Sequence, residues 1–371
     1  MTRIVLIGGG HSHVQVLRAL ARRPQAGLRL SLISREVLTP YSGMLPGVIA
    51  GHYGAAAAHI DLAHLCADAG AELRHDSVTA LEPDAGRLRC ASGAAETWDL
   101  LSVNSGSTPG LQAIDGAAEV GIAVKPIGEF LPRWDRLLTR LRAASDQPFQ
   151  LAIVGAGAGG VELALAIEYR LRRVEGFRQL RLILIDAAPS LLPGHTPRLG
   201  QRLGRILAQR KIEVQTGTRV AAARVGALSM SNGKSIQADE ILWVTPASAP
   251  RWPASAGLAT DARGFIRVDD QLRSVSHPQI FAAGDIASFD SRSLPKAGVF
   301  AVRQGPVLAE NLARAARGQP LRGYRPQGRF LTLISTGNRY AVAARGSWTA
   351  QGAWAWRWKD WLDRRFIGRF R

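Results

Sequence analysis

Two strand, glycine turn and helix patterns constrain the fold of this 371-residue chain more than any other feature. The first joins the apolar run 4–7 to a turn from Gly8 to Gly10, and a helical pattern begins at His11. A helix that starts after glycines offers free backbone N–H groups and the positive end of its dipole to a phosphate. Gly8 and Gly10 supply two glycines of a dinucleotide-binding fingerprint, but His13 stands where the third is expected.

The second pattern begins about 147 residues later and is complete, with Gly155, Gly157 and Gly160 at all three positions. The strand that follows ends at Asp186. A carboxylate at that point accepts a hydrogen bond from a ribose 2′-hydroxyl and repels a 2′-phosphate. Two such units predict two bound dinucleotides, and Asp186 favours NADH over NADPH.

The ribose position of the first unit is irregular, because Ser34 ends the strand and Glu36 follows two residues later. Either side chain could accept a ribose hydroxyl, and Glu36 could equally be a solvated loop residue. His11 and His13 share the preceding turn, but no third or fourth ligand follows nearby. We therefore expect no metal and place both histidines, with Ser12, near the cofactor.

The composition excludes several classes of protein. No apolar run reaches the roughly 20 residues of a membrane span. Cys66 and Cys90 lack the spacing of a dithiol motif, which indicates a reducing compartment and no thiol chemistry. The net charge of +18 favours contact with anionic lipid or an acidic partner, but no nucleic-acid motif is present. We expect a cytoplasmic protein that does not bind nucleic acid.

The segment 276–285, Ser-His-Pro-Gln-Ile-Phe-Ala-Ala-Gly-Asp, completes a known order of motifs. With the two fingerprints, the chain resembles the two-dinucleotide-binding-domain flavoproteins of the pyridine nucleotide-disulfide oxidoreductase fold. Within them it is similar to type II NADH dehydrogenases and sulfide:quinone reductases. The resemblance implies an α/β fold of two Rossmann-like domains, for FAD and for NAD(H), with small antiparallel β insertions and a short C-terminal tail domain. We expect FAD-binding parts at 1–115 and 256–322, the NAD(H) domain at 116–255 and the C-terminal segment at 323–371.

The same resemblance implies further site residues. Asp285 after Gly284 would hold the flavin ribityl chain, and Glu162 would lie near the nicotinamide as a catalytic residue. Gln304 is kept from the acceptor-site helix of quinone-reducing relatives, although their preceding Gln is Val299 here. The remaining expected cofactor contacts are Val78, Asn104, Ser105, Gly106, Lys296, Ala297 and Gly298.

A closer similarity covers three segments, 8–16, 39–47 and 359–366. They resemble the flavoproteins often fused to the N-terminus of selenide, water dikinase. This similarity adds Tyr41 and Ser42 to the expected cofactor contacts.

The tail from 354 to 371 carries aromatic residues at three- or four-residue steps, flanked by arginines. This pattern predicts a basic amphipathic helix with the composition of an interfacial membrane anchor. Packing on the core or on the partner subunit of a homodimer would explain the same pattern, because Trp also suits buried interfaces.

These features predict an enzyme that passes hydride from NADH to FAD and electrons on to a quinone-like acceptor, without a redox-active disulfide. It would lie in the cytoplasm, peripheral on the inner face of the cell membrane. One alternative is reduction of a soluble acceptor, either an electron-carrier protein or a selenium or sulfur species. Another is a flavin redox sensor without turnover.

Overall fold

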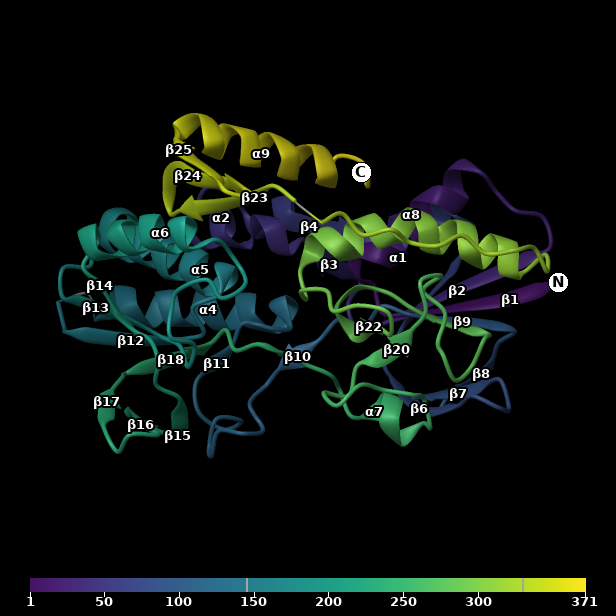
Figure 1. Cartoon of the computed structure of the whole chain (residues 1–371), viewed down its shortest axis with the longest axis horizontal. Coiled ribbons are helices and arrows are strands. Elements are labelled where there is room, and N and C mark those ends of the chain that lie inside the picture. The colour runs from purple at the N-terminus through teal and green to yellow at the C-terminus, as the bar shows by residue number, and fades with distance from the viewer. Residues whose placement is uncertain (145, 329) are drawn as a thin grey trace.

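The computed structural model describes residues 1–144, 146–328 and 330–371. Two five-stranded sheets lie side by side, each packed with helices (Figure 1). The final strands and helix form a smaller unit above the second sheet in this view. The mixed α/β architecture with parallel sheets confirms the predicted fold class.

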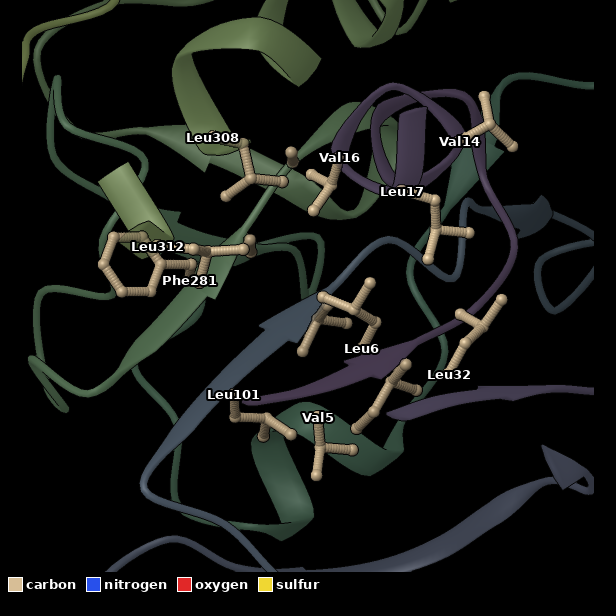
Figure 2. Close-up of a cluster of buried hydrophobic side chains, with 14 of the residues drawn as sticks. Val5, Leu6, Val14, Val16, Leu17, Leu32, Leu101, Phe281, Leu308 and Leu312 are labelled. Carbon is tan, nitrogen blue, oxygen red and sulfur yellow. The ribbon is translucent and has the colours of Figure 1, made fainter. Parts of the chain in front are cut away.

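The first sheet has the strand order β21-β9-β1-β2-β5, and all neighbours pair in parallel. Its strands are β1 (Thr2–Ile7), β2 (Leu28–Ser34), β5 (Glu72–His75), β9 (Leu100–Val103) and β21 (Ile280–Ala282). The helices α1 (His11–Arg22) and α8 (Gly298–Ala315) pack against each other. Figure 2 shows Val16 and Leu17 of α1 beside Leu308 of α8, over Leu6 of the sheet. All four side chains are fully buried, so this core joins α1 to α8, two helices that lie far apart in the sequence.

The second sheet has the order β11-β18-β12-β13-β14 and is also parallel. Its strands are β11 (Ile122–Ala123), β12 (Phe149–Val154), β13 (Leu180–Ile185), β14 (Ile212–Gln215) and β18 (Glu240–Trp243), and its helices are α4 (Ile127–Ala143), α5 (Ala158–Tyr169) and α6 (Pro197–Gln209). Helix α5 is apolar almost all round, as expected of a helix enclosed by protein. Two crossing segments between the sheets pair as β10 (Thr108–Pro109) and β19 (Ala247–Ser248). The bounds of the four predicted segments stay predictions.

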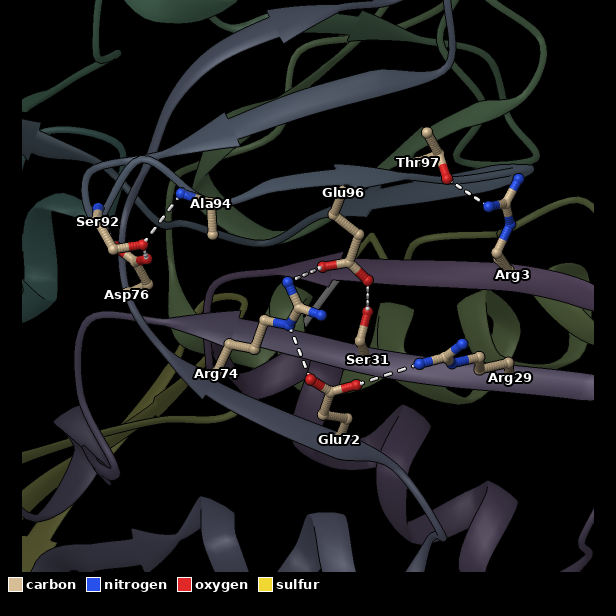
Figure 3. A network of polar contacts seen from close by, with 10 residues as sticks. All are labelled: Arg3, Arg29, Ser31, Glu72, Arg74, Asp76, Ser92, Ala94, Glu96 and Thr97. Carbon is tan, nitrogen blue, oxygen red and sulfur yellow. Dashed lines mark hydrogen bonds and ion pairs between the residues drawn. The ribbon is translucent and has the colours of Figure 1, made fainter.

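Each sheet carries an antiparallel insertion, as expected from the sequence. The insertions are β6 (Val78–Glu82), β7 (Arg87–Cys90) and β8 (Ala95–Thr97), then β15 (Val220–Arg224), β16 (Ala227–Met230) and β17 (Ser235–Gln237). Polar contacts fix the first insertion to the first sheet (Figure 3). The Ser31 hydroxyl donates to Glu96 at 2.6 Å, and Arg74 pairs with both Glu72 and Glu96. Both cysteines are free and buried.

The alanine-rich segment 55–69 differs from the single helix that its composition predicts. It forms a 3-10 turn at Ala55–Ala58, strand β4 (His59–Asp61) and helix α3 (Leu62–Asp68). Strand β4 pairs with β3 (Leu38–Pro40), and the Asp61 carboxylate caps α3 by accepting from the N–H groups of Ala63 and His64. Strand pairing therefore overrides helix propensity here. The other short elements are α2 (Leu45–Ile49), α7 (Trp252–Ser255), β20 (Ile266–Val268) and β22 (Ala287–Phe289).

The C-terminal unit is an antiparallel sheet of β23 (Thr332–Thr336), β24 (Asn338–Arg345) and β25 (Trp348–Gly352), covered by helix α9 (Ala353–Ile367). The predicted terminal helix is confirmed. Phe366 and Phe370 are buried in the core of the first sheet, whereas Trp354, Trp358 and Trp361 are exposed. Among the helices in the described ranges, none has the length and apolar character needed to cross a bilayer.

Candidate functional site

A cavity of about 560 Å³ opens at the carboxyl ends of β1, β2 and β9. This is the edge of a parallel sheet where dinucleotides bind. Most of the predicted FAD contacts line it: Gly8, Gly10, His11, Ser34, Glu36, Ser42, Val78, Asn104, Ser105, Gly106, Asp285, Lys296 and Gly298. Segments that are far apart in the sequence therefore meet at one site, as expected.

The glycine turn after β1 is held by Asn104 at the end of β9. The Asn104 carboxamide accepts from the N–H groups of Ser12 and His13 at 3.0 and 3.3 Å, and donates to Ala283 at 2.6 Å. Gly8 has a φ of 92°, and a Cβ there would lie 2.7 Å from the Asn104 carbonyl oxygen. Only glycine suits this position, because the φ is left-handed and the neighbour is backbone.

His13 explains the irregular fingerprint. Its Nδ1 donates to the Gly8 carbonyl oxygen at 2.6 Å, and its Nε2 accepts from the Ser102 hydroxyl at 2.8 Å. A carbonyl can only accept, so Nδ1 carries a proton. Burial lowers the pKa of His13 to about 4, which keeps the ring neutral. The imidazole thus links the glycine turn to strand β9.

Two predicted cofactor contacts are corrected by these positions. The Ser12 hydroxyl donates to the Ala301 carbonyl oxygen at 2.7 Å, and neither Ser12 nor His13 lines the cavity. Both are positioning residues. His11 does line the cavity, and its buried Nε2 has no hydrogen-bond partner among the described residues. Burial lowers the pKa of His11 to about 4. A neutral, unpartnered ring nitrogen at the wall of the cavity fits a polar ligand there.

Glu36 is better placed than Ser34 to hold a ribose. The Ser34 hydroxyl donates to the Glu36 carbonyl oxygen at 2.8 Å, so its hydrogen is already used. The Glu36 carboxylate lines the cavity and makes no hydrogen bond to any residue that the structure describes. Burial raises the pKa of this carboxyl, although Arg35 and His59 oppose the effect. The structure therefore favours Glu36 of the two alternatives.

Asp285 presents a carboxylate to the same cavity. It accepts from the Lys125 ammonium at 2.8 Å and from the Ser107 hydroxyl at 3.1 Å. Burial alone would raise the pKa of Asp285, but Lys125, Ser107 and Lys296 together lower it. An ionised carboxylate can accept from the hydroxyl groups of a ribityl chain, as the resemblance implies.

Gln304 supports Asp285 indirectly, through a hydrogen bond to the preceding residue. Its Oε1 accepts from the Gly284 N–H at 2.6 Å, and the side chain is almost completely buried. Gln304 therefore holds the turn that presents Asp285, and the first cavity does not include it. Gln304 and the backbone at Gly284 and Ala297 face an adjoining polar cavity of about 370 Å³, which shares Asp285 and Lys296 with the first.

Lys296 lies just before α8, where the two cavities meet. Its ammonium donates to the Ala287 carbonyl oxygen at 2.5 Å and lies 3.9 Å from the centre of the Phe265 ring. Burial lowers the pKa of Lys296 to about 8. Gly298, in the first turn of the helix, also lines the first cavity. Lys296 and Gly298 thus line the cavity, and their contact with the cofactor stays a prediction.

A third cavity, of about 150 Å³, lies between α5 and the end of β18. It shares Ser42, Lys125 and Ile127 with the first cavity, so the two adjoin. Glu162 lines it on one side. The Thr245 hydroxyl, also in its wall, is buried without a hydrogen-bond partner in the described ranges. A small polar group such as an amide would satisfy this hydroxyl.

The second glycine fingerprint has the geometry of a pyrophosphate site. A Cβ at Gly155, whose φ is 116°, would collide with the Val244 carbonyl oxygen, and one at Gly160 would collide with Gly155. A Cβ at Gly157 would meet nothing within 4 Å. The outer glycines are thus required for close packing, and the middle one faces open space that a phosphate can approach.

Asp186 fixes the same turn. Its carboxylate accepts from the N–H groups of Ala156 and Ala188 at 2.5 and 2.8 Å. Each carboxylate oxygen can accept more than one hydrogen bond, so a ribose hydroxyl can still be held. The described groups of both units therefore fit dinucleotides.

Glu162 belongs to a buried cluster that the sequence did not reveal. Its carboxyl accepts from the Ser335 N–H at 2.7 Å. Burial raises the pKa of Glu162 to about 7, although Lys359 and the Ser335 N–H oppose the shift. A carboxyl group that titrates near neutral pH can both hold and release a proton at the site.

Lys359 and Asp363 reach this cluster from α9. The Lys359 ammonium donates to the Gly43 carbonyl oxygen at 2.6 Å and to Asp363 at 2.8 Å. Burial alone would lower the pKa of Lys359, but Asp363 and Glu162 more than compensate and raise it. Tyr41 does not line the first cavity as predicted; its hydroxyl hydrogen-bonds to Asp363, and its ring packs 4.5 Å from Phe366.

Lys125, Lys359 and Asp363 were missed by sequence reasoning. One signal could have found the lysines. Only five of the 47 basic Lys and Arg residues are lysines, and Lys125, Lys296 and Lys359 all lie at this site.

Two parallel sheets, each with a glycine turn between a strand and a helix, together with the two adjoining cavities define a double dinucleotide-binding flavoprotein fold. The family model described as pyridine nucleotide-disulphide oxidoreductase matches residues 2–305. The chain therefore belongs to this family and is an oxidoreductase. FAD and NAD(H), the cofactors predicted from the sequence, are the cofactors of this family.

Individual relatives agree with this membership. A NADH dehydrogenase-like protein of Mycobacterium tuberculosis is 28% identical, and the match covers 93% of this chain and 88% of that protein. A type II NADH:quinone oxidoreductase of the same organism is 24% identical over 95% of this chain and 81% of its own.

Solved structures show the same fold. The sulfide:quinone oxidoreductase of Aquifex aeolicus superposes with a TM-score of 0.84 at 19% identity, covering 100% of this chain and 92% of that one. The NDH2 of Plasmodium falciparum in complex with NADH gives 0.81 at 14% identity, covering 100% and 97%. None of the relatives described here is a selenide, water dikinase fusion, so that part of the resemblance stays a prediction.

Proposed function

We propose that the protein is an FAD-dependent NADH oxidoreductase that passes electrons to a quinone-like acceptor without a redox-active disulfide. One observation carries this proposal: the cavity at the first fingerprint adjoins the cavity beside Glu162 through Ser42, Lys125 and Ile127. Two cofactors that met with their reactive ends at this junction would be placed for direct hydride transfer.

The residues of the chain divide the work of binding and orientation. FAD, when bound, supplies the hydride-accepting and electron-passing chemistry. Glu36 and Asp285 offer carboxylates to its hydroxyl groups, and Val78 lines the cavity near the end of β2. Asp186 selects NADH by accepting from the ribose and repelling a 2′-phosphate. Glu162 holds an exchangeable proton beside the nicotinamide side of the junction.

The surroundings of the cysteines support a mechanism without thiols. Burial raises the pKa of the Cys66 thiol to about 11 and also raises that of Cys90. A thiolate is the reactive form of cysteine, so both are poor nucleophiles. The residue of the segment 39–47 that lines both cavities is Ser42, which carries a hydroxyl and not a thiol.

A quinone-like acceptor is supported by the activities for which relatives are named and by the surface of α9. One relative is a demethylphylloquinone reductase of Synechocystis, 26% identical over 74% of this chain and 69% of its own. Trp354, Trp358 and Trp361 form an exposed aromatic face, and the Arg365 guanidinium lies over the Trp361 ring. Aromatic rings with adjacent arginines suit the interface of an anionic membrane. We therefore place the protein peripherally on the inner face of the cell membrane; a homodimer stays a prediction.

The test is an acceptor screen on the purified protein. The isolated protein should show flavin absorbance that NADH bleaches without oxygen within seconds. Subsequent addition of a short-chain quinone should restore the absorbance and sustain turnover. Protein that binds no FAD after reconstitution would refute the core of the proposal. Reoxidation only by an electron-carrier protein or a selenium or sulfur compound would replace the quinone by a soluble acceptor.

A further inference from the structure

We propose that Lys125 is the electrostatic partner of the bound flavin, stabilising the negative charge that hydride transfer delivers. This inference rests on the proposed function and assigns a residue to its central step. Lys125 follows β11, at the point where the chain enters the second sheet. It lies outside both glycine fingerprints and outside the Gly284-Asp285 turn.

The position of Lys125 connects the two redox sites. Of the three residues that line both cavities, Ser42, Lys125 and Ile127, only the lysine carries a charge. A bound flavin and a bound nicotinamide must meet at this junction for hydride to pass. The ammonium therefore lies at the reaction step itself.

Its hydrogen bonds fix the ammonium and leave one donor free. Nζ donates to Asp285 at 2.8 Å and to the Ser107 hydroxyl at 3.3 Å. An ammonium has three hydrogens, so the third remains for a ligand. The Lys125 side chain is 43% exposed. Lys125 is thus anchored on one side and open to the cavity on the other.

The two cavities hold acidic as well as basic side chains, so the position of each lysine decides what it faces. Lys125 and Lys296 both act on the single carboxylate of Asp285. Lys296 lines the first and the adjoining polar cavity but not the cavity beside Glu162, and its ammonium is bound to Ala287. Lys359 is paired with Asp363. Among the lysines that the structure describes at this site, Lys125 is therefore the one that lines both cavities.

The electron balance explains why this charge matters. A hydride carries two electrons and one proton, so a neutral flavin that accepts it gains one negative charge while NADH becomes NAD⁺. A preorganised cation lowers the free energy of charge that develops in a cavity shielded from water. Lys125 should therefore raise the reduction potential of the bound flavin and speed its reduction.

The experiment compares K125M, K125Q and K125R with wild type and with K234M, which removes an exposed lysine. FAD is kept in excess, and the flavin midpoint potential and the affinity for sulfite are measured. Sulfite adds to the oxidised ring through its sulfur and leaves a negative charge there, so it reports the same electrostatic field without turnover. K125Q can still donate to Asp285, which separates the charge from the hydrogen bond.

Both neutral variants should lower the two-electron reduction constant at least tenfold, or about 30 mV, and weaken sulfite binding at least tenfold. K125R should retain most of both properties, and K234M should match wild type. A K125Q protein that binds FAD with wild-type potential and sulfite affinity would overturn the inference and leave Lys125 only a support for Asp285. A wild type that binds no flavin would instead refute the proposed function.

Discussion

Glu162 offers a quantitative test because its carboxyl is buried beside a cavity and titrates late. The substitution E162Q preserves the shape of the side chain and removes the ionisation. The amide can still accept the hydrogen bond that the Ser335 N–H donates at 2.7 Å. Any pH-dependent difference between the two proteins then reports the carboxyl itself.

The magnitude follows from the pKa of Glu162, which rises from 4.5 to about 7 on folding. One pKa unit corresponds to about 1.4 kcal/mol, so the shift corresponds to about 3 kcal/mol. Between these pH values the folded protein holds a proton that the unfolded chain has released. The free energy of unfolding therefore falls as pH rises from 4.5 to 7, and the full cost persists above pH 7.

The assay is urea unfolding with FAD in fixed excess, at pH 4.5 and at pH 8, followed by tryptophan fluorescence. Between these two pH values, wild type should lose about 3 kcal/mol more stability than E162Q. The exposed E119Q variant is the matched control and should follow wild type. An equal pH dependence in wild type and E162Q would refute the argument that burial holds this proton.

Three further outcomes are expected. H13L leaves the Gly8 carbonyl and the Ser102 hydroxyl unpaired in the core, so urea unfolding should show a loss of about 3 kcal/mol. G157V fills the open space before α5, and titration should show NADH affinity reduced at least 100-fold with flavin absorbance kept. The double variant W358S/W361S removes exposed rings, so co-sedimentation with anionic lipid vesicles should fall at least tenfold while binding to zwitterionic vesicles stays low.

Local spacing was enough to predict the two glycine turns and the acid after the second. The spacing of Gly155, Gly157 and Gly160 is contained in one segment and can be read there, although the contact that requires Gly155 comes from Val244. His13 shows the limit of such reasoning. Its fit depends on Ser102, which lies 89 residues away on β9. The sequence showed that His13 departs from the fingerprint, but it could not show that the imidazole bonds to both Gly8 and Ser102.

Contacts between distant segments account for the rest of the site. Lys125 meets Asp285 across 160 residues, and Lys359 reaches Gly43 across 316. No sequence spacing links the two members of either pair, although Gly43 and Lys359 lie in the segments 39–47 and 359–366, so only the assembled fold shows the contact. The segment 55–69 departs from a single helix for a related reason, since the pairing of β4 with β3 decides the local structure there.

Helix α9 shows how one amphipathic pattern can serve two surfaces. The aromatic residues of the tail read as a single stripe, but the structure divides them. Phe366 shares a buried face with Lys359 and Asp363, at the helical steps i, i+4 and i+7, whereas Trp358 and Trp361 are exposed on the neighbouring face.

An ion pair inside and bare indole rings outside reverse the usual arrangement of a surface helix. Burying Lys359 and Asp363 costs desolvation free energy that their pairing offsets only in part, which indicates a role at the site. Exposed tryptophans on the other face indicate a surface that meets a partner. A helix with its side chains is roughly 10 Å across. Under the proposed function, a membrane or acceptor that docks on the tryptophans would therefore lie about one helix diameter from the Glu162 cluster.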